Sequence, residues 1–346
     1  MQNLRELLGS IDRAHLPQPG SSKRQDFKEW YHFNIVDPDQ GLDIIFNFSL
    51  AGDVTRAGAA RADVIALCHL AGGGWFGAID SYDGVAVEVA SDRLMITLGP
   101  NRVTFADNAY HIAWRLQDES FVLDAKLSPR VEPLLIWNET SVGSGSLNWL
   151  IVPDLETSGQ LTIGGTTKSF HRIDSYHDHN WGSWRWGEDF GWDWGFATEP
   201  RPAPEAPALT LVFGRTASRN GDTVYEQNLA VWNHAELAKF FTRRQIRARR
   251  EGRHLGDIPR LPGAARLINQ GRVLNVPARY CISARDDPDW LDIEYSVETA
   301  LQISVPTDFG FGLVDLNETF GTARIRGEVG GRPVAFVTRA CFEFMG

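Results

Sequence analysis

The chain has 346 residues, of which 43% are hydrophobic and 23% are charged. It is long enough for one large or two ordinary domains, and its composition is that of a folded globular protein, which excludes general disorder. With 34 basic and 44 acidic residues, the formal net charge is -10. This charge disfavours nucleic acid and anionic membranes as general partners, so we expect a hydrophobic small-molecule partner and at most peripheral membrane contact.

The cysteines and the first residues bear on the cellular compartment. Cys68, Cys281 and Cys341 lie far apart and form no CxxC pair, and one of them must stay unpaired whatever the bonding. We therefore expect buried thiols in a reducing cytosol. Charges at Arg5 and Glu6 interrupt the apolar core that a signal peptide needs, and no charge-free apolar run approaches the ~18 residues of a spanning helix. These features predict a cytoplasmic protein.

Short β-rich segments dominate the first part of the chain. They are separated by turn formers at a spacing of roughly 10 to 15 residues, which favours an antiparallel meander over βαβ units. The segments lie at residues 42–50, 64–70, 85–89, 94–98, 109–116 and 121–127.

A second series of strand-like segments follows Pro153, at residues 160–163, 209–213, 228–232, 291–297, 323–329 and 334–344. An antiparallel chain of this length must close on itself or cover its edges. We therefore predict an all-β protein with two antiparallel β-barrel or curled-sandwich domains. The expected parts are an N-terminal arm at residues 1–24, a first β domain at residues 25–165 and a second β domain at residues 166–346.

One segment, residues 234–253, departs from the strand pattern. Leu237, Phe240 and Phe241 have helical spacing there and predict one connecting helix. Basic residues surround them, at Lys239, Arg243, Arg244, Arg247, Arg249, Arg250 and Arg253. These form either a solvated helix face or a local patch that steers an anionic substrate group or an acidic partner.

The segment 176–194 carries the candidate chemistry, with five tryptophans, two histidines and three aspartates. Tryptophan is large and usually partly buried, so the cluster predicts either a packed seam or an aromatic-walled cavity. If the segment begins as a strand, alternation places Tyr176, Asp178 and Asn180 on one face. His177, His179 and Trp181 then lie on the other face, and Trp192 and Trp194 lie opposite Asp193.

Asp178 and Asp193 are the candidate catalytic acids. A carboxyl group among indoles loses hydration, which raises its pKa and lets it act as a general acid near neutral pH. Aromatic faces can also stabilise a developing cation and exclude water, as the protonation of an alkene requires. The other predicted catalytic residues are Tyr176, His177 and His179. The predicted substrate-binding residues are Trp30, Tyr31, Trp181, Trp184, Trp186, Trp192 and Trp194.

The same residues also have structural explanations. Asp178 and Asn180 could cap turns or bind backbone amides, and His177 and His179 could be buried structural histidines. An HxH pair could bind zinc in a hydrolase, but no further ligand lies at an informative spacing, so no metal is predicted. There is no GxSxG elbow or phosphate loop, and the glycines at residues 72–74 lack the helix context of a dinucleotide site, so no cofactor is predicted.

Three stretches resemble a known family. Residues 176–182 read YHDHNWG, residues 29–32 read EWYH, and the tail from Gly321 to Glu343 is a glycine-rich hairpin. They are similar to segments of the carotenoid 1,2-hydratase (hydroxyneurosporene synthase) and AttH-like family, which is related to lipocalin-like cyclases and Diels-Alderases. The resemblance covers the chain from residue 25 to its end. It implies two lipocalin-like barrels with a hydrophobic pocket near their junction, and cofactor-free chemistry on carotenoid, terpenoid or other polyene substrates.

One departure from the family pattern concerns the acid. The segment from Ala208 reads ALTLVFGRT, without the carboxylate that we expect in the hydratases, so either the site is adapted to cyclisation or Asp178 or Asp193 supplies the acid. We expect a lyase or isomerase that acts on a lipophilic isoprenoid or polyene by acid-initiated hydration or cyclisation, or by pericyclic closure. The alternative is a carrier whose pocket binds the same lipophile without converting it.

Overall fold

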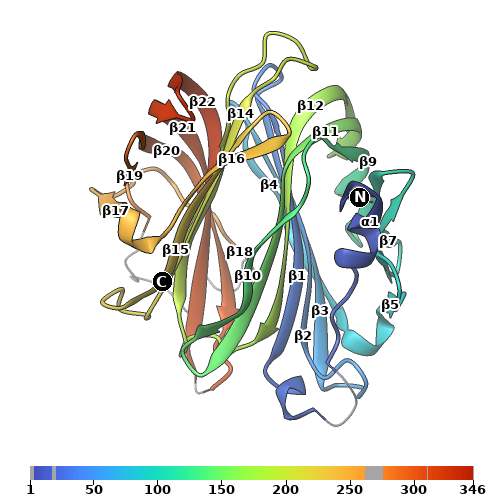
Figure 1. Cartoon of the computed structure of the whole chain (residues 1–346). Helices are drawn as coiled ribbons and strands as arrows, with labels where there is room; N and C mark the ends of the chain where they lie inside the picture. Colours follow the sequence, from blue (N-terminus) through green and yellow to red (C-terminus); the bar gives the residue numbers. More distant parts are fainter. Residues whose placement is uncertain (1–3, 18–20, 262–275, 310, 346) are drawn as a thin grey trace. The chain divides into compact units, whose positions relative to one another are not determined.

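The computed structural model describes residues 4–17, 21–261, 276–309 and 311–345, and it shows an all-β protein (Figure 1). The strands form a 12-stranded and a 10-stranded sheet, which are antiparallel except for one short pairing. The chain divides into two compact units, residues 1–184 and 185–346, and each unit contains one sheet. The predicted all-β class is confirmed.

The first unit begins with α1 (Leu4–Ile11) and also contains the one-turn helices η1 (Ser22–Arg24) and η2 (Gly84–Ala86). Its strands are β1 (Phe27–Asp37), β2 (Leu42–Gly52), β3 (Ala60–Leu70), β4 (Gly74–Asp83), β5 (Glu88–Val89), β6 (Met95–Leu98), β7 (Asn101–Ala106), β8 (Ala109–Arg115), β9 (Phe121–Pro129), β10 (Leu134–Val142), β11 (Gly145–Ile163) and β12 (Thr166–Ser183). The order across the sheet is β4-β3-β2-β1-β12-β11-β9-β8-β7-β6-β5, with β10 paired to β11.

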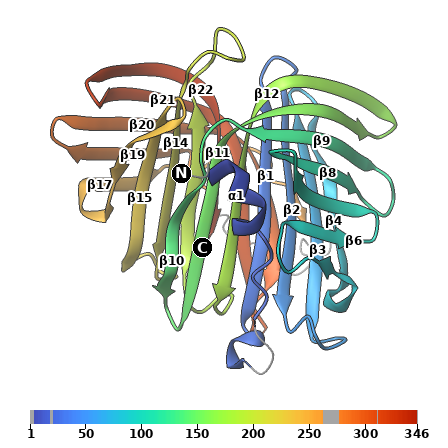
Figure 2. The same cartoon turned by 45° about the vertical axis from the view of Figure 1, so that its right-hand side comes forward.

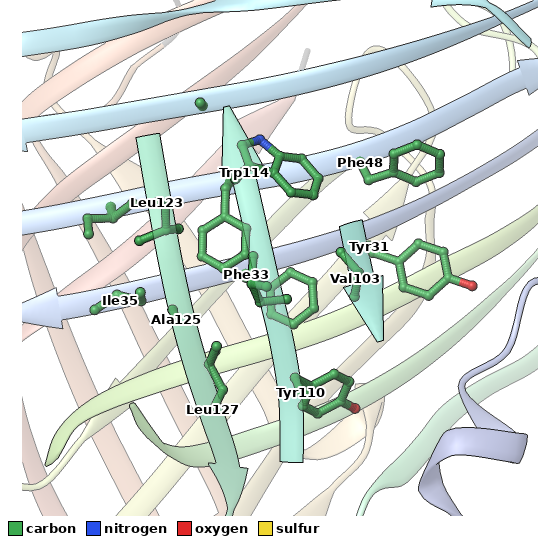
Figure 3. Packing of buried hydrophobic residues seen from close by; sticks show 14 of the residues in the cluster. Tyr31, Phe33, Ile35, Phe48, Val103, Tyr110, Trp114, Leu123, Ala125 and Leu127 are labelled. Atoms are coloured by element: carbon green, nitrogen blue, oxygen red, sulfur yellow. The ribbon is translucent and has the colours of Figure 1, made fainter. Parts of the chain in front are cut away.

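The first sheet curls around a single hydrophobic core. Phe33 on β1, Trp114 on β8 and Leu123 on β9 belong to the same buried cluster (Figure 3), although β1 and β8 are separated by three strands in the sheet order. Phe33 also stacks on Phe46 of β2, with 4.9 Å between ring centroids. Leu8 of α1 is fully buried in this cluster, so the N-terminal helix packs on the core of the first unit.

Close approach of β11 and β12 requires the glycine of the YHDHNWG stretch. A Cβ atom added at Gly182 would lie 2.1 Å from the backbone oxygen of Ser146, so the backbone would have to shift. We expect Gly182→Ala to lower the free energy of unfolding by about 1–3 kcal/mol, as measured by urea denaturation. Thr166→Ala, at an exposed end of the same strand, should change it by less than about 0.5 kcal/mol. Equal stability of the two variants would contradict the steric argument.

The second unit contains β13 (Gly191–Thr198), β14 (Leu209–Ala217), β15 (Val224–Asn233), β16 (Glu236–Phe241), η3 (Arg243–Gln245), β17 (Ile246–Glu251), β18 (Arg260–Leu261), β19 (Arg279–Asp286), β20 (Asp289–Pro306), β21 (Leu313–Val329) and β22 (Arg332–Met345). Its order is β16-β15-β14-β13-β22-β21-β20-β19-β17, with β18 paired to β20. Figure 2 shows the long neighbouring strands β20, β21 and β22. Phe213, Tyr280 and Phe342 belong to a separate core in this unit.

The closing hairpin forms as the glycine-rich tail predicts. Val329 of β21 pairs with Arg332 of β22, and the two residues between them, Gly330 and Gly331, have φ angles of 60° and 76°. Positive φ at both central positions is the geometry of a tight hairpin turn, which glycine adopts without strain.

The strand at residues 166–183 was expected to open the second domain. Instead, β12 pairs with β1 and β11, and the structure places it in the first unit, which ends at Trp184. The N-terminal residues 4–17 also belong to this unit. β12 belongs to the first unit because it lies between two strands of the first sheet and forms backbone hydrogen bonds with both.

The prediction of a connecting helix at residues 234–253 is wrong. The segment forms β16, η3 and β17, because its backbone pairs with neighbouring strands: β16 with β15 and β17 with β19. The apolar residues do not share one buried face, since Phe241 is fully buried whereas Leu237 is 44% exposed. The local helical preference indicated by the spacing of three apolar residues was therefore outweighed by hydrogen bonding to neighbouring strands.

The three cysteines form no disulfide within the described part of the chain; Cys68 and Cys341 are buried, as expected, and Cys281 is partly buried. Among the described residues, none of the helices has the length and apolar character needed to cross a membrane.

Candidate functional site

Asp178 lies on one face of β12 with hydrogen-bond donors around it. Its side chain is buried, with 4% of the residue exposed. The Tyr176 hydroxyl donates to its Oδ2 atom at 2.9 Å, and the Asn180 amide donates to its Oδ1 atom at 3.0 Å. Trp149 of β11 makes a further side-chain hydrogen bond with the carboxyl group. We call Tyr176, Asp178, Asn180 and Trp149 the Asp178 cluster.

Indole side chains extend this cluster along the same face of the sheet. Trp30 on β1 and Trp149 on β11 are the cross-strand partners of Asn180, and direct partners point to the same face. The Trp149 ring lies 4.7 Å from that of Trp137 on β10. The Trp30 ring lies 5.3 Å from that of Trp184 in an edge-to-face contact. The acid is therefore accompanied by four indoles of its own unit.

The environment of Asp178 favours its protonated form. Burial raises the pKa of Asp178 to about 6, although interactions with His177 and His179 and hydrogen bonds from Tyr176 and Trp149 oppose the rise. A carboxyl group with this pKa keeps a fraction of its protons near neutral pH and can act as a general acid. Its cross-strand partner on β1, His32, is neutral there because burial lowers its pKa to about 3.

The opposite face of β12 contacts the N-terminal segment. Asp12, which follows α1, is fully buried. Its carboxylate accepts hydrogen bonds from the Tyr110 hydroxyl at 2.8 Å, His177 Nε2 at 2.9 Å and His179 Nδ1 at 2.7 Å. The alternation predicted for residues 176–181 is therefore confirmed, since both histidines point away from the Asp178 face.

Glu29 on β1 adds a second carboxylate to this face. Its Oε1 atom accepts hydrogen bonds from His179 Nε2 at 2.9 Å and from the backbone N–H of His15 at 2.7 Å. Its Oε2 atom is buried and has no hydrogen-bond partner within the described part of the chain. Tyr31, expected to bind substrate, stacks on His179 at 3.9 Å between centroids. We call Asp12, Glu29, Tyr110, His177 and His179 the Asp12 cluster.

An imidazolium–carboxylate pair lies at the centre of the Asp12 cluster. Burial alone would lower the pKa of His179, but the hydrogen bonds and charges of Asp12 and Glu29 outweigh burial and raise it to about 9. Burial likewise opposes ionisation of Asp12, yet its interactions with His177 and His179 hold its pKa well below the usual range. His179 therefore carries a positive charge at neutral pH.

The raised pKa of His179 predicts a pH-dependent stability. A folded-state pKa above the unfolded value gives stability that is complete below about pH 6.5 and is lost as the pH rises through 9. This contribution is about 3–4 kcal/mol, because one pKa unit corresponds to about 1.4 kcal/mol. Urea denaturation should show the unfolding free energy of the native protein falling over this range, and His179→Gln should lack that fall. Parallel pH curves for the two proteins would contradict the prediction.

Asp193, the other candidate acid, has different surroundings. It lies on β13 in the second unit with 2% of the residue exposed. Its carboxylate forms ion pairs with Arg215, at 3.1 Å, and with Arg250, and it accepts the Tyr280 hydroxyl at 2.7 Å. Two arginines and a hydroxyl donor therefore use this carboxylate as a hydrogen-bond acceptor. Of the two candidates, Asp178 has the environment that favours a proton.

The predicted substrate-binding aromatic residues are divided between the two units. Those of the first unit are Trp30, Tyr31, Trp181 and Trp184, and those of the second are Trp186, Trp192 and Trp194. Trp181 stacks on the His15 ring, 4.0 Å away. Trp192 donates its indole N–H to Glu343 at 2.6 Å and so lies opposite Asp193, as predicted.

Sequence reasoning did not find five residues of these clusters as site residues: Asp12, Glu29, Tyr110, Trp149 and Asn180. Asp12 contacts His177 across 165 positions of the chain, so no local pattern could connect them. Glu29 did carry a signal, because it begins the EWYH stretch.

The described residues contain no group of three or more His, Cys, Asp or Glu side chains that could hold a metal ion. A pocket of about 260 Å³ in the first unit lies between the N-terminal segment and the end of β2. Its walls contain no member of the Asp178 cluster. It is lined by Leu16, Pro17, Arg24, Gly52, Asp53, Val54 and Thr55.

No family model and no curated protein matches this chain. Solved structures do match it. A candidate AttH protein from Nitrosomonas europaea is 14% identical, with a TM-score of 0.65 over 96% of each chain. Kievitone hydratase from Nectria haematococca is 10% identical, with a TM-score of 0.59 over 95% of this chain and 94% of that one. CghA, solved with Sch210972, is 12% identical, with a TM-score of 0.59 over 97% and 96%.

At these identities, the similarity concerns the fold. It confirms the predicted resemblance to the lipocalin-like, AttH-like architecture, and it extends over nearly the whole chain. A shared fold does not assign chemical roles to individual residues.

Proposed function

We propose that this protein is a cofactor-independent enzyme that protonates a carbon–carbon double bond of a lipophilic isoprenoid or polyene, with Asp178 as the proton donor. The observation that carries the proposal is a buried carboxyl group with a pKa raised to about 6, on a sheet face that also bears four indoles. Because burial disfavours the ionised form, a fraction of the Asp178 carboxyl groups keep their proton near neutral pH and can donate it. One solved structure of the same fold belongs to a protein named as a hydratase, which supports the reaction class.

The reaction begins with transfer of the Asp178 proton to one alkene carbon. The π electrons form the new C–H bond, the other carbon becomes a carbocation, and Asp178 becomes a carboxylate. Indole faces stabilise that cation through their quadrupoles. The hydrogen bonds from Tyr176 and Asn180 stabilise the carboxylate that remains.

Two outcomes restore the acid. In hydration, water adds to the carbocation and the resulting oxonium loses a proton to the Asp178 carboxylate. In cyclisation, a second double bond of the substrate attacks the carbocation, and a carbon next to the new cation then loses a proton to the Asp178 carboxylate, which leaves a new double bond. In both cases the acid is regenerated, so no cofactor is consumed.

The test is a product analysis in deuterated water. The purified protein is incubated with farnesol, squalene and lycopene, and the extracts are compared by mass spectrometry with extracts from protein-free samples. Acid-initiated chemistry places one deuterium on carbon for each double bond protonated. A new product without deuterium would contradict proton donation and favour pericyclic closure. Recovery of the bound lipophile unchanged would contradict catalysis and favour a carrier.

A further inference from the structure

The Asp178 cluster and the Asp12 cluster lie back to back on one strand. Asp178 is flanked in the sequence by His177 and His179, so the carboxyl group and the two imidazoles leave the same stretch of β12 in opposite directions. The two clusters also share β1 as a neighbouring strand. On that strand His32 pairs with Asp178, and the adjacent residue Tyr31 pairs with His179.

Both imidazoles are held at both of their ring nitrogens. His177 contacts Asp12 through Nε2 at 2.9 Å and donates from Nδ1 to the His32 backbone oxygen at 2.9 Å. His179 contacts Asp12 through Nδ1 and Glu29 through Nε2. Two bonds per ring leave neither imidazole free to rotate, and both rings anchor β12 to its neighbours.

The free energy needed to bury the charged groups of the Asp12 cluster indicates that they have a specific role. Asp12, Glu29, His177 and His179 are all fully buried, among aromatic rings such as Phe33, which stacks on His177 at 4.0 Å. Burying ionised groups costs several kcal/mol each, and a well-packed apolar cluster often stabilises a core as well or better. Stability alone therefore does not explain ionic groups at this position.

We propose that the Asp12 cluster is a positioning network for Asp178: it fixes β12 from the opposite face of the sheet and holds a positively charged imidazole behind the carboxyl group. The inference rests on the proposed function and deepens it. It assigns Asp12 and Glu29 as positioning residues, and it makes the N-terminal segment, residues 4–17, part of the active enzyme through Asp12.

The charged groups around Asp178 and His179 determine whether the pKa of Asp178 should rise or fall when the network is altered. Around Asp178, the titratable groups are His32 on β1, Tyr176 on the same face of β12, and His177 and His179 on its opposite face, whereas β11 contributes Trp149 and Ile151, which carry no charge.

Around His179, the titratable groups are Asp12, Glu29, Tyr31, His15 and His177. His177 and the positive charge of His179 both favour ionised Asp178 and so oppose the effect of burial. Removing that charge should therefore raise the pKa of Asp178.

The experiment follows the Asp178 carboxyl carbon by NMR in protein labelled with ¹³C-aspartate, with the signal assigned by its loss in Asp178→Asn. In His179→Gln, the titration midpoint should rise by about 0.5 to 1 pH unit, the order expected for one charge several ångströms away. Asp12→Asn and Glu29→Gln should shift it in the same direction, because each weakens the hold on the His179 proton. Where one of these variants does not fold, the other two carry the test.

Two controls separate this effect from general disturbance. Asp43→Asn breaks another carboxylate–histidine contact of the first unit, the one with His69 at 3.2 Å, and should leave the midpoint unchanged. Glu119→Gln breaks an exposed ion pair of the same unit, the one with Arg115 at 3.2 Å, and should also leave it unchanged. An unchanged midpoint in folded His179→Gln, or equal shifts in Asp43→Asn, would overturn the inference.

Activity gives a second readout. With the substrate found in the product analysis, the alkaline limb of kcat against pH should move up in His179→Gln by the same amount as the NMR midpoint, with KM little changed. If Asp178→Asn proves fully active, the proposed function fails, while the NMR comparison still decides whether the network acts on Asp178.

Discussion

Replacing Asp178 by Asn is expected to lower kcat by about 100-fold or more, which is the usual contribution of a positioned general acid. Asparagine keeps the size of the side chain and can still accept the hydrogen bond from Tyr176. It has no acidic proton, so the carbocation cannot form. KM should change little, because the indoles that would contact the substrate are untouched. The measurement is steady-state product formation, with folding verified by circular dichroism and thermal denaturation.

The comparison needs two further variants. Asp43→Asn, which alters a buried carboxylate away from the Asp178 cluster, should retain turnover within about threefold if it stays folded, because it removes no group that contacts substrate. Asp193→Asn tests the other candidate acid. A large loss in Asp193→Asn together with an active Asp178→Asn would move the role to Asp193. Full activity of both would exclude both as proton donors and favour pericyclic closure.

Replacing Asp12 by Asn is expected to lower the free energy of unfolding by about 3–5 kcal/mol, because it removes one partner of a buried ion pair and leaves the other charge uncompensated. The carboxylate accepts hydrogen bonds from Tyr110, His177 and His179, and an amide offers one acceptor oxygen in its place. Urea denaturation near pH 7 measures the change.

A surface ion pair provides the matched control. Glu119 contacts Arg115 at 3.2 Å with 70% of its side chain exposed, and Glu119→Gln should cost no more than about 1 kcal/mol. A loss of similar size in Asp12→Asn would show that the Asp12 cluster contributes little to folding, and would leave the N-terminal segment without the anchoring role described above.

The strands could be predicted from the sequence wherever an apolar β-rich run ended at a turn. The runs at residues 42–50 and 209–213 lie in β2 and β14, whereas the run at residues 85–89 begins in η2. Alternation along residues 176–181 predicted which side chains share a face, because the period of a strand is fixed by its geometry. The helix at residues 234–253 failed because pairing with strands elsewhere in the chain decides such a segment.

The candidate site could be predicted only in part. Asp178 was expected to lie among the indoles of residues 176–194, whereas three of the indoles that accompany it, Trp30, Trp137 and Trp149, come from neighbouring strands. Asp193 shows why sequence adjacency is a poor guide: Trp192 and Trp194 are its neighbours in the chain, yet alternation turns them to the opposite face. The ion pairs with arginines that define its surroundings are 22 and 57 positions away.

The central claim is that Asp178 is a buried acid with a raised pKa, so that a fraction of it keeps the proton near neutral pH. Titration of its ¹³C-labelled carboxyl carbon in the native protein tests this most directly. The structure predicts a midpoint near pH 6, with the signal identified by its absence in Asp178→Asn. A midpoint near the ordinary aspartate value of about 4 would contradict the account, because the carboxyl group would then be ionised at neutral pH and could not start the reaction.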